Sequence, residues 1–148
     1  MKFTVQQFQT VFARYTADYD KASGEISKYI LENDPATFIF VASGISVGMV
    51  RPADVRVFSI IYDCIREAGY KFELSPCAML DVKEQFAADK QAFIEGEISW
   101  LAKNNPVAYQ LIETVPYDSL LALLYLAIAR RTAEFPEPTE PANEPVGA

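Results

Sequence analysis

The chain has 148 residues, about half of them apolar, with 13 basic and 20 acidic side chains and no histidine. A chain of this length buries enough apolar surface for one core, so we expect a single domain. Four acids lie in the last fifteen residues, which leaves sixteen acids against thirteen bases in the body. This balance has the wrong sign for binding phosphate backbones and is too mild for a dedicated nucleic-acid mimic, so we expect no nucleic-acid partner.

Prolines that follow capping side chains mark several predicted helix starts. A side-chain acceptor followed by proline suits the N-cap and first positions of a helix, because the missing proline N–H is unpaired there anyway. Three such pairs occur in the chain: Asp34-Pro35, Ser75-Pro76 and Asn105-Pro106. This punctuation predicts an all-α, single-domain bundle of five to seven short helices over residues 1–133.

In the N-terminal half, the first helix should begin at Thr4, with Gln7 completing a capping box, and a second should run from Ser23 to Asn33. Residues 34–50 are ambiguous, because the aromatic and branched run at 37–41 suits a buried strand. The Asp34-Pro35 start and the length of the segment favour a helix, which we predict. Residues 53–68 show the most regular apolar stripe and predict another helix.

In the C-terminal half, residues 70–74 alternate like a strand, which would form a small two-stranded β element if they paired with residues 38–41. One long amphipathic helix is predicted over 81–104 and a short one after Asn105-Pro106. Residues 120–131 are apolar almost all round, which is typical of a helix in the middle of a bundle or in an oligomer interface. Residues 134–148 contain four prolines and four acids and predict a disordered tail. We see no repeat at a fixed period.

Cysteine usage and the lack of long apolar segments indicate the compartment. Cys64 and Cys77 form no disulfide framework, and the first ten residues lack the basic start and apolar run of a secretory signal. We therefore expect a cytoplasmic protein with two buried thiols. The longest charge-free segment, Pro35 to Val50, is shorter than the roughly 20 residues that cross a bilayer, so we expect no membrane association.

One short motif suggests nucleophilic catalysis. Residues 44–48, Gly-Ile-Ser-Val-Gly, resemble the nucleophile elbow of the α/β-hydrolase family, which would make Ser46 the nucleophile. That mechanism requires a histidine to take the serine proton, and the chain contains none. We predict instead that Gly44 and Gly48 share a helix face and allow close packing.

The remaining polar residues predict no catalytic, cofactor-binding or metal site. The lack of histidine removes the usual zinc, haem and di-iron ligand sets, and the two cysteines are not clustered. Glu95 and Glu97 flank Gly96 but point about 200° apart on a helix, so they suit a solvated face better than an acid–base pair. Arg130 and Arg131 are interpreted as cations at the negative end of a helix dipole.

We expect a non-catalytic protein–protein interaction or assembly module, acting as an adaptor, inhibitor or structural component. The apolar helix at 120–131 further suggests a homo-oligomer, most simply a twofold dimer. One alternative is a small histidine-independent enzyme or ligand-binding domain with an aromatic and carboxylate pocket built from Tyr62, Tyr70, Glu73 and Trp100. A second alternative is an acidic decoy of a nucleic-acid-binding protein, which would need a row of acids on one face.

Overall fold

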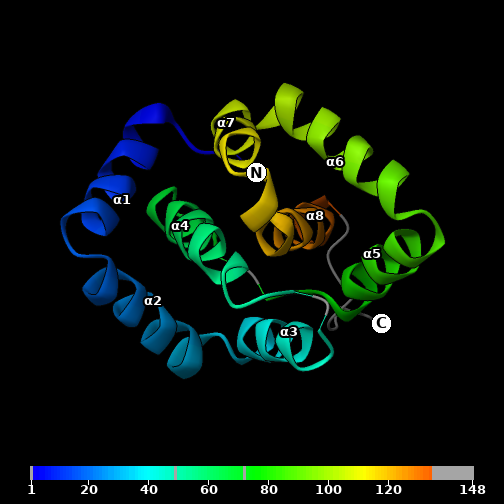
Figure 1. Ribbon diagram of the computed structural model, residues 1–148, viewed down its shortest axis with the longest axis horizontal. Coiled ribbons are helices and arrows are strands. Elements are labelled where there is room, and N and C mark those ends of the chain that lie inside the picture. Colours follow the sequence, from blue (N-terminus) through cyan, green and yellow to red (C-terminus); the bar gives the residue numbers. More distant parts are fainter. Residues whose placement is uncertain (1, 49, 72, 135–148) are drawn as a thin grey trace, which may run out of the picture.

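The computed structural model describes residues 2–48, 50–71 and 73–134 of the chain. Within these ranges it contains eight α-helices and one short 3₁₀ helix (Figure 1). The helices are α1 (Val5–Ala17), α2 (Tyr19–Asn33), α3 (Pro35–Ser46), α4 (Asp54–Glu67), α5 (Pro76–Ala88), α6 (Lys90–Asn104), α7 (Pro106–Thr114), η1 (Pro116–Asp118) and α8 (Leu120–Glu134). The predicted all-α class is confirmed.

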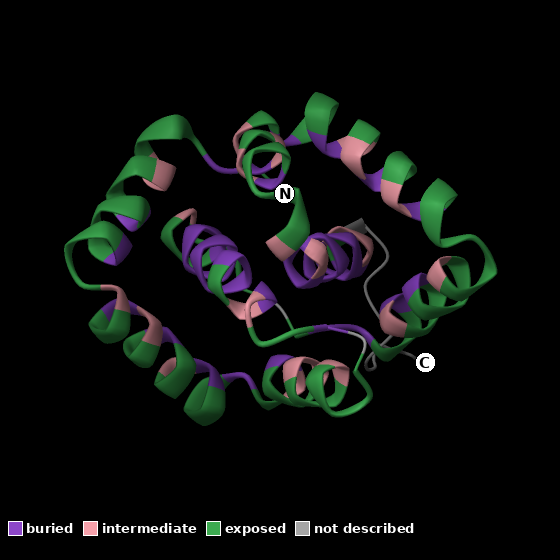
Figure 2. Ribbon diagram, in the orientation of Figure 1, coloured by how far each residue is buried: buried purple, intermediate pink, exposed green. Residues whose placement is uncertain are grey.

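Six of the α-helices form a ring around the other two (Figure 1). The helices α4 and α8 pack against each other inside the ring. Figure 2 shows that these two helices are the most buried of the fold. Every residue from Leu121 to Ala129 is at most 4% exposed. The apolar helix predicted at 120–131 is therefore enclosed by its own chain, so it does not supply the oligomer interface that the sequence left open.

The ring contains two similar three-helix segments, a repeat that the sequence analysis missed. The residues that cap α1, α2 and α3 are followed 71 positions later by those that cap α5, α6 and α7: Thr4 and Ser75, Asp18 and Asp89, Asp34 and Asn105. Asp18 has φ −158° and ψ 92°, and Asp89 has φ −156° and ψ 91°. Each segment continues into one inner helix, α4 or α8, so the fold is a twofold repeat of four helices.

The helix count exceeds the predicted five to seven, because one predicted helix is in fact two. The long helix expected over 81–104 breaks at Asp89, whose carboxylate accepts the backbone N–H of Ala92 at 3.1 Å and caps α6. Asp18 caps α2 in the same way, so that helix begins at Tyr19 and not at Ser23. A single aspartate provides both the end of one helix and the start of the next, with no proline to signal the break.

The ambiguous segment after Asp34 is helical, as predicted, and forms α3 up to Ser46. The helix predicted over 53–68 is confirmed as α4. The suggested β element is wrong, since no strand occurs in the described ranges and the described residues of 70–74 form an unpaired connection to α5. Residues 135–148 lie outside the described part of the chain, so the disordered tail remains a prediction.

The two cysteines lie in different environments. Cys64 is fully buried in α4, and burial raises the pKa of its thiol to about 12. Cys77 is exposed near the start of α5, so the prediction of two buried thiols is wrong for this residue. The first turn of α5 faces solvent at Cys77 because the adjacent Ala78 faces the core.

A buried ion pair joins the ring helix α6 to the inner helix α8. Glu97 is 5% exposed and accepts hydrogen bonds from Arg130 Nε at 3.0 Å and from Arg131 Nη2 at 2.9 Å. Burial alone would raise the pKa of Glu97, but the two arginines lower it below its usual value. Glu95 is exposed, so the two acids do point apart, yet the prediction that Glu97 belongs to a solvated face is wrong. The arginines bind this carboxylate and are more than helix-dipole cations.

Candidate functional site

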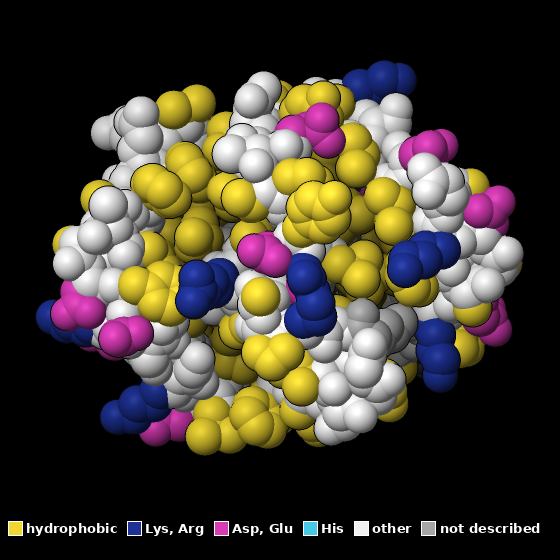
Figure 3. All heavy atoms as spheres, in the orientation of Figure 1, with side chains coloured by type: hydrophobic (Ala, Val, Ile, Leu, Met, Phe, Trp, Pro, Cys, Tyr) yellow, Lys and Arg dark blue, Asp and Glu magenta, His cyan; other side chains and the backbone are white. Residues whose placement is uncertain are grey.

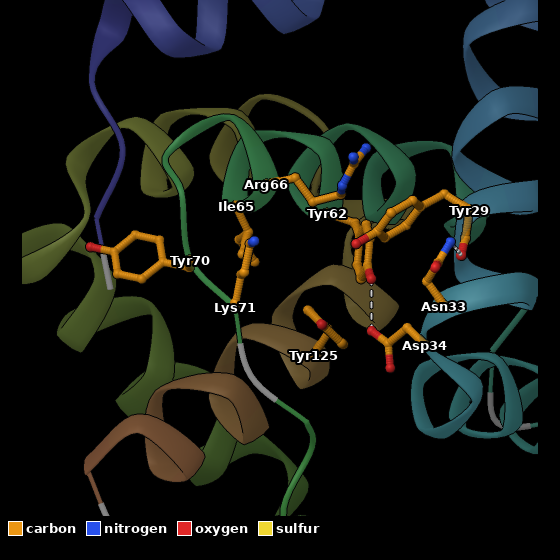
Figure 4. Close-up of a pocket in the computed structure, with 9 residues that line it drawn as sticks. All are labelled: Tyr29, Asn33, Asp34, Tyr62, Ile65, Arg66, Tyr70, Lys71 and Tyr125. Atoms are coloured by element: carbon orange, nitrogen blue, oxygen red, sulfur yellow. Dashed lines mark hydrogen bonds between the residues drawn. The ribbon is translucent and has the colours of Figure 1, made fainter.

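A polar pocket lies where α2, α4 and α8 meet (Figure 4). Its volume is about 190 Å³. The lining residues are mostly tyrosines and charged side chains: Tyr29, Asn33, Asp34, Tyr62, Ile65, Arg66, Tyr70, Lys71 and Tyr125. Tyr62 and Tyr70 belong to the aromatic and carboxylate pocket that the sequence suggested as an alternative, so this pocket is a candidate catalytic or ligand-binding site.

Asp34 is the carboxylate of the pocket, and its oxygen atoms are already bound. Tyr62 donates its hydroxyl hydrogen to Asp34 Oδ2 at 2.7 Å, and Thr37 Oγ1 donates to the same oxygen at 2.8 Å (Figure 4 shows the first bond). The other oxygen accepts the backbone N–H of Thr37 at 3.3 Å and caps α3. A carboxylate held by these donors serves to start a helix and to fix the junction of α2, α3 and α4.

Several other polar groups of the pocket are also engaged: Asn33 Nδ2 donates to the Tyr29 carbonyl oxygen at 3.1 Å, and the Tyr70 hydroxyl oxygen accepts the backbone N–H of Lys2 at 3.0 Å. The guanidinium carbon of Arg66 lies 3.8 Å from the ring centroid of Tyr29, a cation–π contact between α4 and α2. Burial raises the pKa of Tyr62 and of Tyr125, so both phenols stay protonated at neutral pH. Neither phenol is therefore an activated nucleophile, and we interpret the pocket as a structural junction.

The other sequence-predicted site residues lie elsewhere. Glu73 is exposed and does not line this pocket, and Trp100 lies on α6, where the guanidinium of Arg130 is 4.4 Å from its ring centroid. Ser46 is the last residue of α3, and no strand precedes it in the described chain, so the strand-to-helix turn of a nucleophile elbow is not formed. The structure brings together only Tyr62 and Tyr70 of the four proposed pocket residues.

The helix α3 is the least buried apolar element of the ring. It contains no charged residue, yet Thr37 is its only fully buried side chain. Phe38 is 45% exposed, Ile39 61% and Ile45 38%. Figure 3 shows hydrophobic side chains gathered over α3 at the lower edge of the view. Exposed apolar side chains that are clustered in this way mark interaction surfaces in soluble proteins.

An apolar groove runs between α3 and α5, with α8 at its floor, and has a volume of about 510 Å³. The helix α3 contributes one wall with a stripe that includes Phe40 and Ser43 and continues to Val47, and α5 contributes the other. The floor is formed by three side chains of α8 that are at most 4% exposed: Leu121, Leu124 and Ile128. The groove was not predicted from the sequence, because a charge-free segment such as residues 35–46 is typical of a fully enclosed helix.

The two glycines of the predicted packing motif have different roles. A Cβ on Gly44 would lie 3.0 Å from the Val50 side chain, so the close contact that we expected exists, but within one connection and not between two helices. Gly48 lies beyond the end of α3 and has a φ of +73°, and a Cβ at this position would have no neighbouring atom within 4 Å. Gly48 is needed for its left-handed backbone conformation, so the prediction that it packs closely is wrong.

Metal and membrane sites find no support in the described ranges. No group of three or more acidic or thiol side chains there is arranged to hold a metal ion. None of the described helices combines the length and the apolar character that a bilayer crossing requires.

Comparison of the chain with models of known protein families, with curated proteins and with solved structures finds no significant match.

Proposed function

We propose that this protein is a non-catalytic protein–protein interaction module whose docking surface is the outer face of α3. The observation that carries the proposal is the exposure of Phe38 and Ile45 on a helix without a charged residue. These two side chains lie seven residues apart and therefore on one face, which Ala42 shares. Burying an exposed side chain of this size contributes roughly 1.5–3 kcal/mol, so a partner that covers the face gains substantial stabilisation.

We further propose that the first partner is a second copy of the chain. In a twofold dimer the same patch occurs on both subunits, so an uncharged apolar helix meets an equally uncharged surface and no charge is buried unpaired. A highly charged partner would have to desolvate its charges against α3 without compensation. The lack of charge on this face thus favours an apolar partner surface, and α3 of a second subunit provides such a surface.

The acids of the described chain favour this proposal over the acidic decoy. At least six of them form ion pairs with arginines of the same chain: Asp54, Asp63, Glu67, Asp81, Glu97 and Asp118. A nucleic-acid mimic needs unpaired carboxylates in a row to attract the basic surface of its target. These internal pairs reduce the charge that would be available for such a role.

Sedimentation equilibrium at micromolar concentration tests self-association. We expect a species of about twice 16.5 kDa for the wild type and a monomer for Phe38→Lys and for Ile45→Lys. Val5→Lys is the matched control, because Val5 is 59% exposed on α1 and lies outside the proposed face. Circular dichroism checks that each variant is folded.

A monomeric wild type would refute the dimer and leave a different protein as the partner. In that case a photo-crosslinking amino acid at position 38 should give a protein adduct in cells that position 5 does not give. If the wild type is monomeric and position 38 gives no specific adduct, the proposed function is wrong.

A further inference from the structure

The groove between α3 and α5 has the dimensions of a small-molecule site. Its volume of about 510 Å³ falls within the roughly 300–1,000 Å³ that ligand pockets enclose. Its lining is apolar except for two polar side chains, the hydroxyl of Ser43 and the ammonium group of Lys83. We propose that this groove binds a single-chain aliphatic amphiphile with an anionic head group, such as a fatty carboxylate, with its chain against α8 and its head beside Lys83.

The lining favours an aliphatic chain over an extended peptide. A peptide in this groove would bring several backbone N–H and C=O groups, and each that is buried without a partner costs free energy. Ser43 and Lys83 are the only lining side chains that can bind them. A chain of methylene groups has no such requirement, and it gains free energy from every CH₂ that it buries against Leu121, Leu124 and Ile128.

Lys83 determines the charge that the head group should carry. It is exposed on α5 at the edge of the groove and is the only charged residue among the lining side chains. No ion pair links it to an acid in the described ranges, whereas several arginines of the chain have such partners. An anionic head near this ammonium group is favoured by charge, and a cationic head is disfavoured.

Small residues on the α3 wall keep the groove open. Ser43 lies three residues after Phe40 on the groove-facing stripe, and Gly44 follows it without a side chain. A large side chain at position 43 would project into the space that the ligand needs. Val47, at the end of the same wall, is 73% exposed and offers a second position at which to narrow the groove.

The proposed ligand site is separate from the proposed protein-docking face. Phe40 and Ser43, which line the groove, lie about 160° and 140° from Phe38 around α3. The groove lining therefore lies mainly on the opposite side of α3 from the docking face. This inference therefore goes beyond the proposed function, and either can hold without the other.

Calorimetric titration of the full chain with octanoate, decanoate and dodecanoate, each below its micelle concentration, tests the site. We expect saturable binding at one site per chain, with Kd tightening on the order of tenfold for each two added carbons. The Phe38→Lys variant should bind equally well, which separates this result from self-association. If none of the three binds saturably, or if Kd is independent of chain length, the inference is wrong.

Two pairs of variants locate the site. Ser43→Phe and Val47→Trp should each weaken decanoate binding at least tenfold, and circular dichroism with thermal melting verifies that they fold. Lys83→Gln should weaken decanoate binding roughly two- to fivefold, as expected for loss of an exposed charge pair, and should leave decanol binding unchanged. Lys28→Gln, an exposed lysine on α2, is the charge-matched control.

If both folded groove variants bind decanoate like the wild type, the ligand lies elsewhere and the inference is overturned. Equal affinity of the wild type for decanol and decanoate, together with no effect of Lys83→Gln, would refute the anionic head group.

Discussion

Glu97→Ala should be among the most destabilising single substitutions in the chain. Glu97 is 5% exposed, and its removal would leave the guanidinium groups of Arg130 and Arg131, whose side chains are 15% and 11% exposed, without their shared carboxylate. Breaking a buried ion pair by removing one partner typically costs 3–5 kcal/mol. Asp81 remains 3.1 Å from Arg131, and both arginines keep some contact with water, so we expect the lower end, about 3 kcal/mol.

Urea denaturation measures this loss directly, and thermal melting provides a second estimate. For a domain of this size a loss of about 3 kcal/mol corresponds to a decrease in Tm of roughly 6–12 °C. Glu95→Ala is the matched control, because Glu95 is exposed two positions earlier on α6 and should change stability by less than about 0.5 kcal/mol. If Glu97→Ala and Glu95→Ala have the same stability, the buried pair does not stabilise the fold as we argue.

The pH dependence of stability should report on the same pair. Hydrogen bonds from Arg130 and Arg131 outweigh the opposing effect of burial and place the pKa of Glu97 below its ordinary value of 4.5. A carboxyl with a lowered pKa in the folded state stabilises the protein above its unfolded pKa, and this contribution disappears as the pH falls through the folded pKa. The wild type should therefore lose its stability advantage over Glu97→Gln as the pH falls below the ordinary glutamate value of 4.5. A difference that stays unchanged as the protein is acidified below that pH would contradict the assignment.

Three further predictions concern the thiols, the glycines and the chain end. Iodoacetamide at neutral pH should alkylate exposed Cys77 in the folded protein and modify Cys64 only after unfolding, and mass spectrometry of the digested protein distinguishes the two. Gly44→Leu should cost about 1–3 kcal/mol by overpacking, whereas Gly48→Ala should cost about 1–2 kcal/mol through its backbone conformation, both measured by urea denaturation. Removal of residues 135–148 should shift Tm by only a few degrees, and a larger loss in a melting experiment would show that they stabilise the body.

Local hydrogen bonding explains which parts of the fold were predictable. Thr4, Asp34, Ser75 and Asn105 each accept a backbone N–H of the helix that they begin, an interaction that depends only on residues three positions apart. The helix starts that follow Thr4, Asp34 and Asn105 were therefore predicted correctly. Ser75-Pro76 was recognised as a capping signal, but the helix was predicted only from residue 81, whereas α5 begins at Pro76. Asp89 makes the same type of bond inside a continuous amphipathic pattern, and without a proline it could not be distinguished from an exposed residue of one long helix.

The candidate sites depended on contacts that are distant in the sequence. Tyr62 and Asp34 are 28 residues apart, and their hydrogen bond links the carboxylate that caps α3 to the inner helix α4. Glu97 and Arg130 are 33 residues apart, so the sequence could not show that an acid on α6 is buried against α8. Residue type alone indicated that these side chains can ionise and form hydrogen bonds. Long-range contacts determine which partners they bind.

The helices α3 and α8 show most clearly the difference between what local sequence determines and what packing of the whole chain determines. Capping and composition are local properties, and they were enough to predict that residues 35–46 and 120–129 form helices without a charged residue. Neither property distinguishes α8, which other helices enclose, from α3, which lies in the outer ring with apolar side chains exposed. Burial depends on which neighbours surround a helix, and that arrangement follows from packing of the whole chain.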